Sequence, residues 1–235
     1  MNKLLTALLV VFTLISCEKV ENKSSDLFTF VPEGSSFVIS TNNSSVFIAQ
    51  IESSELFDKD EIKSKFNISA LKEYIQLLEP SRSLIAFSKK DSLSYNYLVI
   101  SKAKKDSLLL KNQPNFSVES ISTKELDYKK ISIDNNITYS AFIDNTILAS
   151  SSKSLLIDAV NQSRPKNIRS ESFNKAIAAA SLDKTALFIN HAVLETIADK
   201  KNMSANKLDK PIADWSVLDL DLGSQKMNFN GIAVS

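Results

Sequence analysis

Hydrophobic residues in the first part of the chain change between the spacing of a strand and that of a helix. A continuous apolar run over 37–40 predicts a short buried strand, and Asn43 is among the candidate caps of the helix that follows. A second amphipathic helix is expected to end before Pro80. Its apolar residues recur at i, i+3, i+4 and i+7: Leu71, Tyr74, Ile75 and Leu78. Alternating segments over 83–88 and 95–101 then predict a hairpin with a polar loop.

The middle of the chain predicts a meander of strands followed by helices. Four short strands are expected, at 118–122, 128–133, 137–142 and 146–150. Asp134 and Asn145 are among the turn residues between them, because Asp and Asn tolerate positive φ and bond their own backbone. Helices are predicted over 153–162 and 173–180.

The last part of the chain repeats the order strand, helix, strand, strand. A strand over 186–190 and a helix from Ala192 to about Lys200 precede strands over 215–223 and 226–234, with a candidate register shift at Gly231. Because the same β-α-β-β order is expected in the first part of the chain, an internal duplication is a hypothesis. Antiparallel hairpins mixed with helices predict an α+β fold rather than a parallel doubly wound sheet.

The chain divides into a short N-terminal region and one region that is expected to fold. Residues 27–235 form the predicted α+β domain, and a duplication would divide it into halves 27–113 and 114–235. Residues 17–26 are polar and lack periodicity, which is typical of a tether. Because an apolar strand leads directly to Ser235, either this strand is tied into the sheet or the chain is the front part of a longer protein, and we favour the second.

The N-terminal residues have the pattern of an export signal. Lys3 precedes an apolar run over 4–15 that is too short for a permanent membrane span. Ser16 followed by Cys17 resembles the lipobox of bacterial lipoproteins. The resemblance implies removal of residues 1–16 and anchoring to a membrane through acyl chains on Cys17. The alternative is an ordinary signal peptide that contains a cysteine. Glu18, in place of the Asp that retains some lipoproteins at the inner membrane, favours the outer membrane.

Composition excludes several classes of function. The chain has 28 Lys+Arg against 27 Asp+Glu and no basic run longer than two residues, so a nucleic-acid partner is not expected. Cys17 is the only cysteine, which leaves no disulfide framework, and a single histidine excludes a site with several histidine ligands. None of the three glycines belongs to a phosphate-binding loop. We therefore expect no cofactor and no metal.

A few polar residues are weak candidates for chemistry. Asp219 and Asp221 share one face of a predicted strand, where two carboxylates either bind a cation, act as acid and base in a hydrolase, or are simply solvated. His191 is expected to start a helix without a catalytic role, and the sole tryptophan, Trp215, to anchor the core or its edge.

Two serines are candidate modification sites. Ser92 and Ser107 each lie in Asp-Ser-Leu, which resembles the acceptor sequence of bacterial O-glycosylation. Both occur in predicted loops, where an acceptor is accessible to a transferase.

Three further stretches resemble a broad group of exported bacterial envelope domains of unknown function: FVPEGSSFV at 30–38, NTILASSS at 145–152 and TALFIN at 185–190. The resemblance implies an envelope domain and carries no catalytic residues to this chain. We therefore expect a lipid-anchored, non-catalytic interaction or scaffold module with an unidentified envelope protein as partner. The alternatives are a carrier of an apolar ligand such as lipid, held between sheet and helices, and a hydrolase that uses Asp219 and Asp221.

Overall fold

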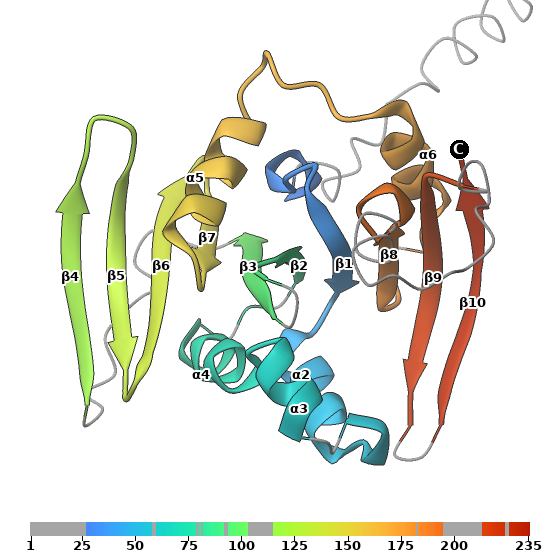
Figure 1. Cartoon of the computed structure of the whole chain (residues 1–235), viewed down its shortest axis with the longest axis horizontal. Helices are drawn as coiled ribbons and strands as arrows, with labels where there is room; N and C mark the ends of the chain where they lie inside the picture. The colour runs from blue at the N-terminus through green and yellow to red at the C-terminus, as the bar shows by residue number, and fades with distance from the viewer. Residues whose placement is uncertain are drawn as a thin grey trace, which may run out of the picture.

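The computed structural model describes residues 27–57, 60–78, 80, 82–91, 94–102, 115–181, 183–194, 213–223 and 226–235. These residues form one ten-stranded sheet, in which every neighbouring pair of strands is antiparallel, with helices on both of its faces (Figure 1). The predicted α+β class is confirmed.

The sheet has the first strand of the chain in its interior and the last strand at one edge. Its strands are β1 (Ser35–Thr41), β2 (Ser83–Lys89), β3 (Tyr95–Lys102), β4 (Phe116–Ser122), β5 (Asp127–Ile133), β6 (Asn136–Ile143), β7 (Thr146–Ser150), β8 (Ala186–Asn190), β9 (Trp215–Leu222) and β10 (Met227–Val234). They lie in the order β10-β9-β8-β1-β2-β3-β7-β6-β5-β4. Both predicted halves of the chain contribute to this sheet, and the internal duplication stays a prediction.

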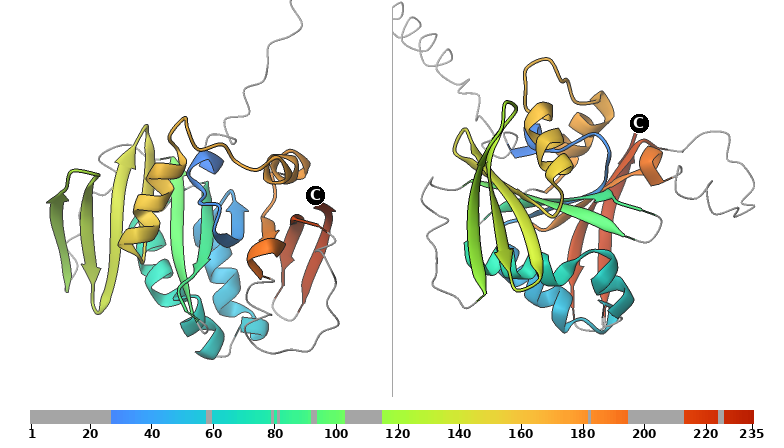
Figure 2. Two further views of the ribbon diagram at one scale, coloured as in Figure 1. Left: turned by 45° about the horizontal axis from the view of Figure 1, so that its top comes forward. Right: turned by 60° about the vertical axis from the view of Figure 1, so that its left-hand side comes forward.

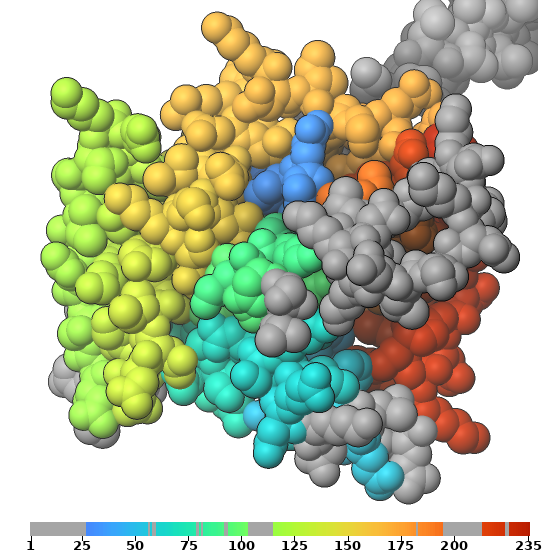
Figure 3. Space-filling view, in the orientation of Figure 1, coloured from blue at the N-terminus to red at the C-terminus, as the bar shows by residue number. Residues whose placement is uncertain are grey.

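Helices cover the two faces in two separate groups (Figures 1 and 2). One face carries α2 (Ser44–Ser53), η2 (Glu55–Phe57), α3 (Asp60–Lys65) and α4 (Ile68–Leu78). The other carries η1 (Leu27–Phe30), α5 (Lys153–Gln162) and α6 (Glu171–Ala179). Figure 3 shows the segment of α3 and α4 in cyan, between β4–β6 on its left and β9–β10 on its right.

Strand alternation divides the buried side chains into two cores. On β1, Val38 joins the core beneath η1, α5 and α6, whereas the next residue, Ile39, joins the core beneath α2 and α4. The first core contains an edge-to-face pair of Phe28 and Phe188, with ring centroids 5.3 Å apart. Successive side chains along a strand therefore point into different cores, because they alternate between the two faces of the sheet.

Caps and turns match the sequence prediction at the positions where polar side chains bond their own backbone. The Oδ1 of Asn43 accepts from the backbone N–H of Val46 at 3.0 Å and so begins α2. Asp134 and Asp144 adopt positive φ, 49° and 47°, in the turns before β6 and β7. Helix α5 and strand β8 have the bounds that the sequence predicts.

The expected register shift at Gly231 is wrong. β10 pairs continuously with β9, from Met227 opposite Leu222 to Val234 opposite Trp215. A Cβ on Gly231 would overlap the carbonyl oxygen of Val217 and lie 2.7 Å from the Cα of Leu218. Glycine at this position therefore allows close approach of the two backbones rather than a bulge.

Candidate functional site

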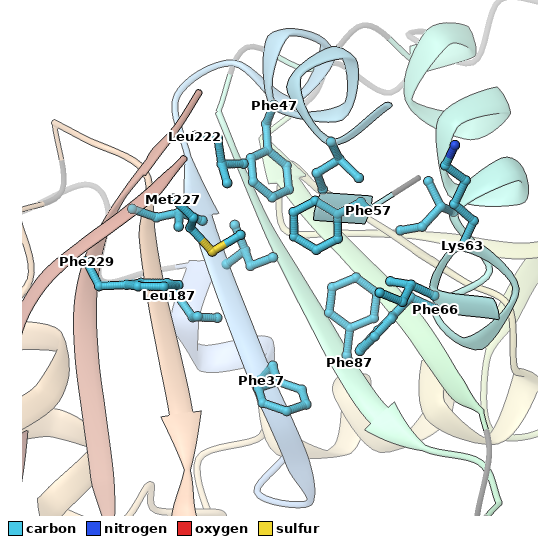
Figure 4. A pocket seen from close by; sticks show the side chains of 15 residues that line it. Phe37, Phe47, Phe57, Lys63, Phe66, Phe87, Leu187, Leu222, Met227 and Phe229 are labelled. Atoms are coloured by element: carbon cyan, nitrogen blue, oxygen red, sulfur yellow. The ribbon is translucent and has the colours of Figure 1, made fainter. Parts of the chain in front are cut away.

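A cavity of about 200 Å³ lies between one face of the sheet and the helices α2 and α3 (Figure 4). It is lined from β1, β2, β8, β9 and β10 on the sheet side, and from α2, η2, α3 and the start of α4 on the helical side. Six phenylalanines of the described residues line it: Phe37, Phe47, Phe57, Phe66, Phe87 and Phe229. The cavity is thus an apolar site assembled from segments far apart in the sequence.

The sheet wall of the cavity consists of residues on alternate positions of neighbouring strands. Leu187 of β8, Leu220 and Leu222 of β9, and Met227 of β10 line it. Register brings them together, because β8 pairs with β9 and β9 pairs with β10. Figure 4 shows Leu187, Leu222 and Met227 across the cavity from Phe57 and Phe66.

Aromatic packing fixes the opposite end of the cavity. The ring of Phe66, in the turn after α3, stacks on Tyr95 with centroids 4.9 Å apart and an interplanar angle of 5°. It also meets Phe87 edge to face at 5.3 Å. Asn67, with a φ of 51°, turns the chain from Phe66 into α4. This wall is therefore preformed by contacts among the protein's own side chains.

Lys63 is the charged side chain among the described residues that line the cavity. Its ammonium group points away from the labelled aromatic rings in Figure 4. The other described lining side chains are hydrocarbons and one thioether, which supply no strong hydrogen-bonding group to a ligand. Binding here would depend on the hydrophobic effect and on dispersion contacts.

The two carboxylates singled out in the sequence lie on the face of β9 opposite to this wall. Asp219 and Asp221 alternate with Leu220 and Leu222, and an Oδ2 atom of Asp219 lies 3.4 Å from the Nζ of Lys184. Asp221 is exposed to solvent. In the part of the chain that the structure describes, no three His, Cys, Asp or Glu side chains gather into a group suited to a metal ion.

His191 and Trp215 both have structural partners. The Nε2 of His191 lies 2.8 Å from the Oγ of Ser216, and its backbone N–H donates to the carbonyl oxygen of Asp214 at 2.9 Å. Trp215 is buried and stacks on Phe173, with ring centroids 4.3 Å apart, so it is the expected core anchor. Sequence reasoning missed Ser216, because its proximity to His191 depends on the pairing of β8 with β9.

The remaining predicted sites, Cys17, Ser92 and Ser107, lie outside the described residues. Acylation and glycosylation therefore stay predictions from the sequence. Among the residues that the structure does describe, no helix is both long enough and apolar enough to span a membrane.

Comparisons with known proteins give a distant likeness among solved structures. No family model matches the chain, and no curated protein matches it. Among solved structures, crystal form I of TP0453 aligns with a TM-score of 0.42 and 16% sequence identity, covering 82% of this chain and 72% of that one.

Proposed function

We propose that this protein is a lipid-anchored, non-catalytic binding module of the cell envelope whose cavity accepts one hydrocarbon chain. The observation that carries this proposal is the apolar cavity between the sheet and α2–α3. Apart from Lys63, its described lining is aliphatic and aromatic side chains and one thioether, which suits a hydrocarbon better than a polar substrate.

The size of the cavity indicates the size of the group that it accepts. A dry apolar cavity of about 150 Å³ is enough to admit benzene. The cavity here, about 200 Å³, is somewhat larger. It therefore suits the end of one acyl or alkyl chain, while the headgroup of such a ligand stays outside in water.

The predicted anchor gives this cavity a source of ligands. Acyl chains on Cys17 would hold the domain at a membrane surface, with the outer membrane as the proposed location. Several chains together make such anchoring durable, because each buried CH₂ contributes about 0.8 kcal/mol, whereas a single chain is marginal. Residues 18–26 keep the domain within about 30 Å of the lipid even when fully extended.

Calorimetry with straight-chain alkanoates of increasing length tests the proposal. Each added methylene is expected to tighten binding about fourfold until the cavity is full, because burial of one CH₂ contributes about 0.8 kcal/mol. Beyond that length the dissociation constant should become constant. Absence of saturable binding across the whole series would contradict the proposal.

Neighbouring residues on β10 offer a matched pair of variants. Met227 lines the cavity, whereas Asn228 is exposed and points to the other face of the sheet. Met227→Trp should fill part of the cavity, so that the dissociation constant becomes constant at a shorter alkanoate. Asn228→Trp should bind alkanoates like the unaltered protein. Equal binding curves for the two variants would place the ligand elsewhere.

A further inference from the structure

The edge strand β10 lacks the features that normally protect a sheet edge from other chains. Its eight residues, Met227–Val234, include neither a charged residue nor a proline. Edge strands usually carry charge or proline, or are short or bulged, because their unpaired backbone groups accept another strand. β10 is instead long and continuous in register with β9.

Both faces of β10 expose large apolar side chains. Phe229 is 50% exposed and lies on the cavity face, and Ile232 is 51% exposed on the opposite face. The described residues contain only five large hydrophobic side chains with such exposure, and these are two of them. Two of these five therefore lie on β10, whose outer edge pairs with no described strand.

The edge strand at the other end of the sheet differs. β4 carries Glu119, which is exposed and lies 4.0 Å from the Nζ of Lys130 on β5. A charge on an edge strand opposes pairing with a further strand. The two ends of the sheet are thus unequal, and β10 is the end open to association.

We propose that β10 pairs antiparallel with β10 of a second copy of this chain, so that two ten-stranded sheets join across a two-fold axis near Asn230. An axis perpendicular to the sheet keeps each face of one copy level with the same face of the other. Phe229 then lies opposite the partner's Gly231 and diagonal to the partner's Phe229 on the cavity face, whereas Ile232 lies opposite the partner's Asn228 on the other face. Such an interface is isologous, the commonest arrangement in soluble dimers.

Charge favours a second copy as the occupant. Because β10 is neutral along its whole length, self-pairing brings no like charges into opposition. The chain as a whole is close to neutral, with 28 basic and 27 acidic side chains, so two copies meet little long-range repulsion.

The position of α6 leaves room for the second copy. This helix packs at the Val234 end of β10, where the Nζ of Lys175 donates to the backbone carbonyl oxygen of Ser235 at 3.2 Å. A two-fold axis near Asn230 places the two α6 helices at opposite ends of the paired strands. Neither helix then obstructs the strand pairing.

Analytical ultracentrifugation of the chain from Glu18 onward tests the proposal without interference from acyl chains, and this chain keeps every described element. We expect a monomer–dimer equilibrium. Asn230→Lys puts two ammonium groups opposite each other near the axis and should raise the dissociation constant roughly fivefold or more. The control, Ser117→Lys on β4, adds the same charge at the other edge and should leave the dimer intact.

Disulfide trapping gives an independent measurement if Asn230→Lys fails to fold. Directly opposed residues of antiparallel strands have Cα atoms about 4.5–5.5 Å apart, within the range of a disulfide. Asn230→Cys should therefore give a covalent dimer on mild oxidation, and Ser117→Cys should not. A chain that stays monomeric throughout a dilution series, or a dimer that both lysine variants leave unchanged, would overturn the proposal.

Discussion

Two buried tyrosines bond strand β6 through their hydroxyl groups, one from within the sheet and one from the helical layer. The hydroxyl of Tyr97 on β3 lies 2.7 Å from the Oγ1 of Thr138, and that of Tyr74 on α4 lies 3.2 Å from the Oγ of Ser140. Both tyrosines are fully buried. Because an unpaired hydroxyl is costly in such surroundings, these two bonds select one position of α4 and β3 relative to β6.

Removal of one hydroxyl should destabilise the protein measurably. Tyr97→Phe leaves the buried hydroxyl of Thr138 without this partner, and we expect a loss of about 1–2 kcal/mol in the free energy of unfolding, measured by urea denaturation. Adding Thr138→Val removes the orphaned group and should recover part of the loss. If the double variant is less stable than Tyr97→Phe alone, the bond is not the cause.

The same burial predicts a loss of stability in alkali. Desolvation raises the pKa of Tyr97 from 10.0 to about 12, and burial also raises the pKa of Tyr74. The unfolded chain therefore loses these protons at lower pH than the folded protein. The contribution of protonated Tyr97 to stability is fully present below about pH 10. Between about pH 10 and 12, the free energy of unfolding should fall by about 1.4 kcal/mol per pH unit because of Tyr97.

Urea denaturation at a series of alkaline pH values measures this slope. Tyr97→Phe should reduce it, because this variant lacks the buried phenol. An equal slope in the variant and the unaltered protein would contradict the assignment to Tyr97.

Local residue roles were predictable from sequence where they depend on near neighbours. Asn43 as a helix cap and Asp134 as a turn residue act on backbone within a few positions, so a short window of sequence contains their cause. The bond between Tyr97 and Thr138 was not predictable. It depends on the order of β3, β7 and β6 in the sheet, which a local pattern does not contain.

At the scale of elements, strand β10 depends on one glycine. Gly231→Ala places a methyl group against the backbone of Val217 and Leu218, so β10 must move away from β9. We expect a loss of about 1–3 kcal/mol in the free energy of unfolding. Gly34→Ala is the matched control, because nothing lies within 4 Å of a Cβ at that position. Thermal unfolding of the two variants measures the difference, and equal melting temperatures would contradict the close approach.

Most elements were predictable because their apolar spacing is regular, and the exceptions lack that signal. Helix α3 was missed: its six residues, DEIKSK, contain one apolar side chain and none that is buried. It nevertheless contributes Ile62 and Lys63 to the cavity. Part of the candidate site thus comes from an element whose sequence shows no amphipathic pattern.

At the scale of the whole molecule, alternation predicts which face a side chain occupies but not which strands are neighbours. The α+β class follows from the mixture of hairpins and helices, whereas the pairing of β1 with β8 and of β3 with β7 has no local signature. The cavity lies where the pairing of β1 with β8 on one side and with β2 on the other brings Leu187, Phe37 and Phe87 together. The sequence therefore allowed a carrier of an apolar ligand as an alternative function, but it did not indicate which residues line the binding site.

Cell fractionation tests the proposed anchor of the whole molecule. The full-length chain is expected in the membrane fraction. Cys17→Ser should release it, because the lipobox resemblance implies acyl chains on Cys17 and on no other residue. Intact-mass spectrometry of the variant shows whether residues 1–16 have been removed. Recovery of the unaltered protein entirely in the soluble fraction would contradict the anchor.

The pairing of β1 with β8 has a consequence for the order in which the protein folds. β1 gains its partner on one side from a strand that begins at Ala186, so this pairing waits until most of the polypeptide has emerged from the ribosome or the export channel. Until then β1 has an open flank beside an unfinished core. Contacts between residues so far apart in sequence slow folding and prolong exposure to aggregation. We therefore expect that premature termination before β8 yields insoluble chains rather than a smaller folded protein.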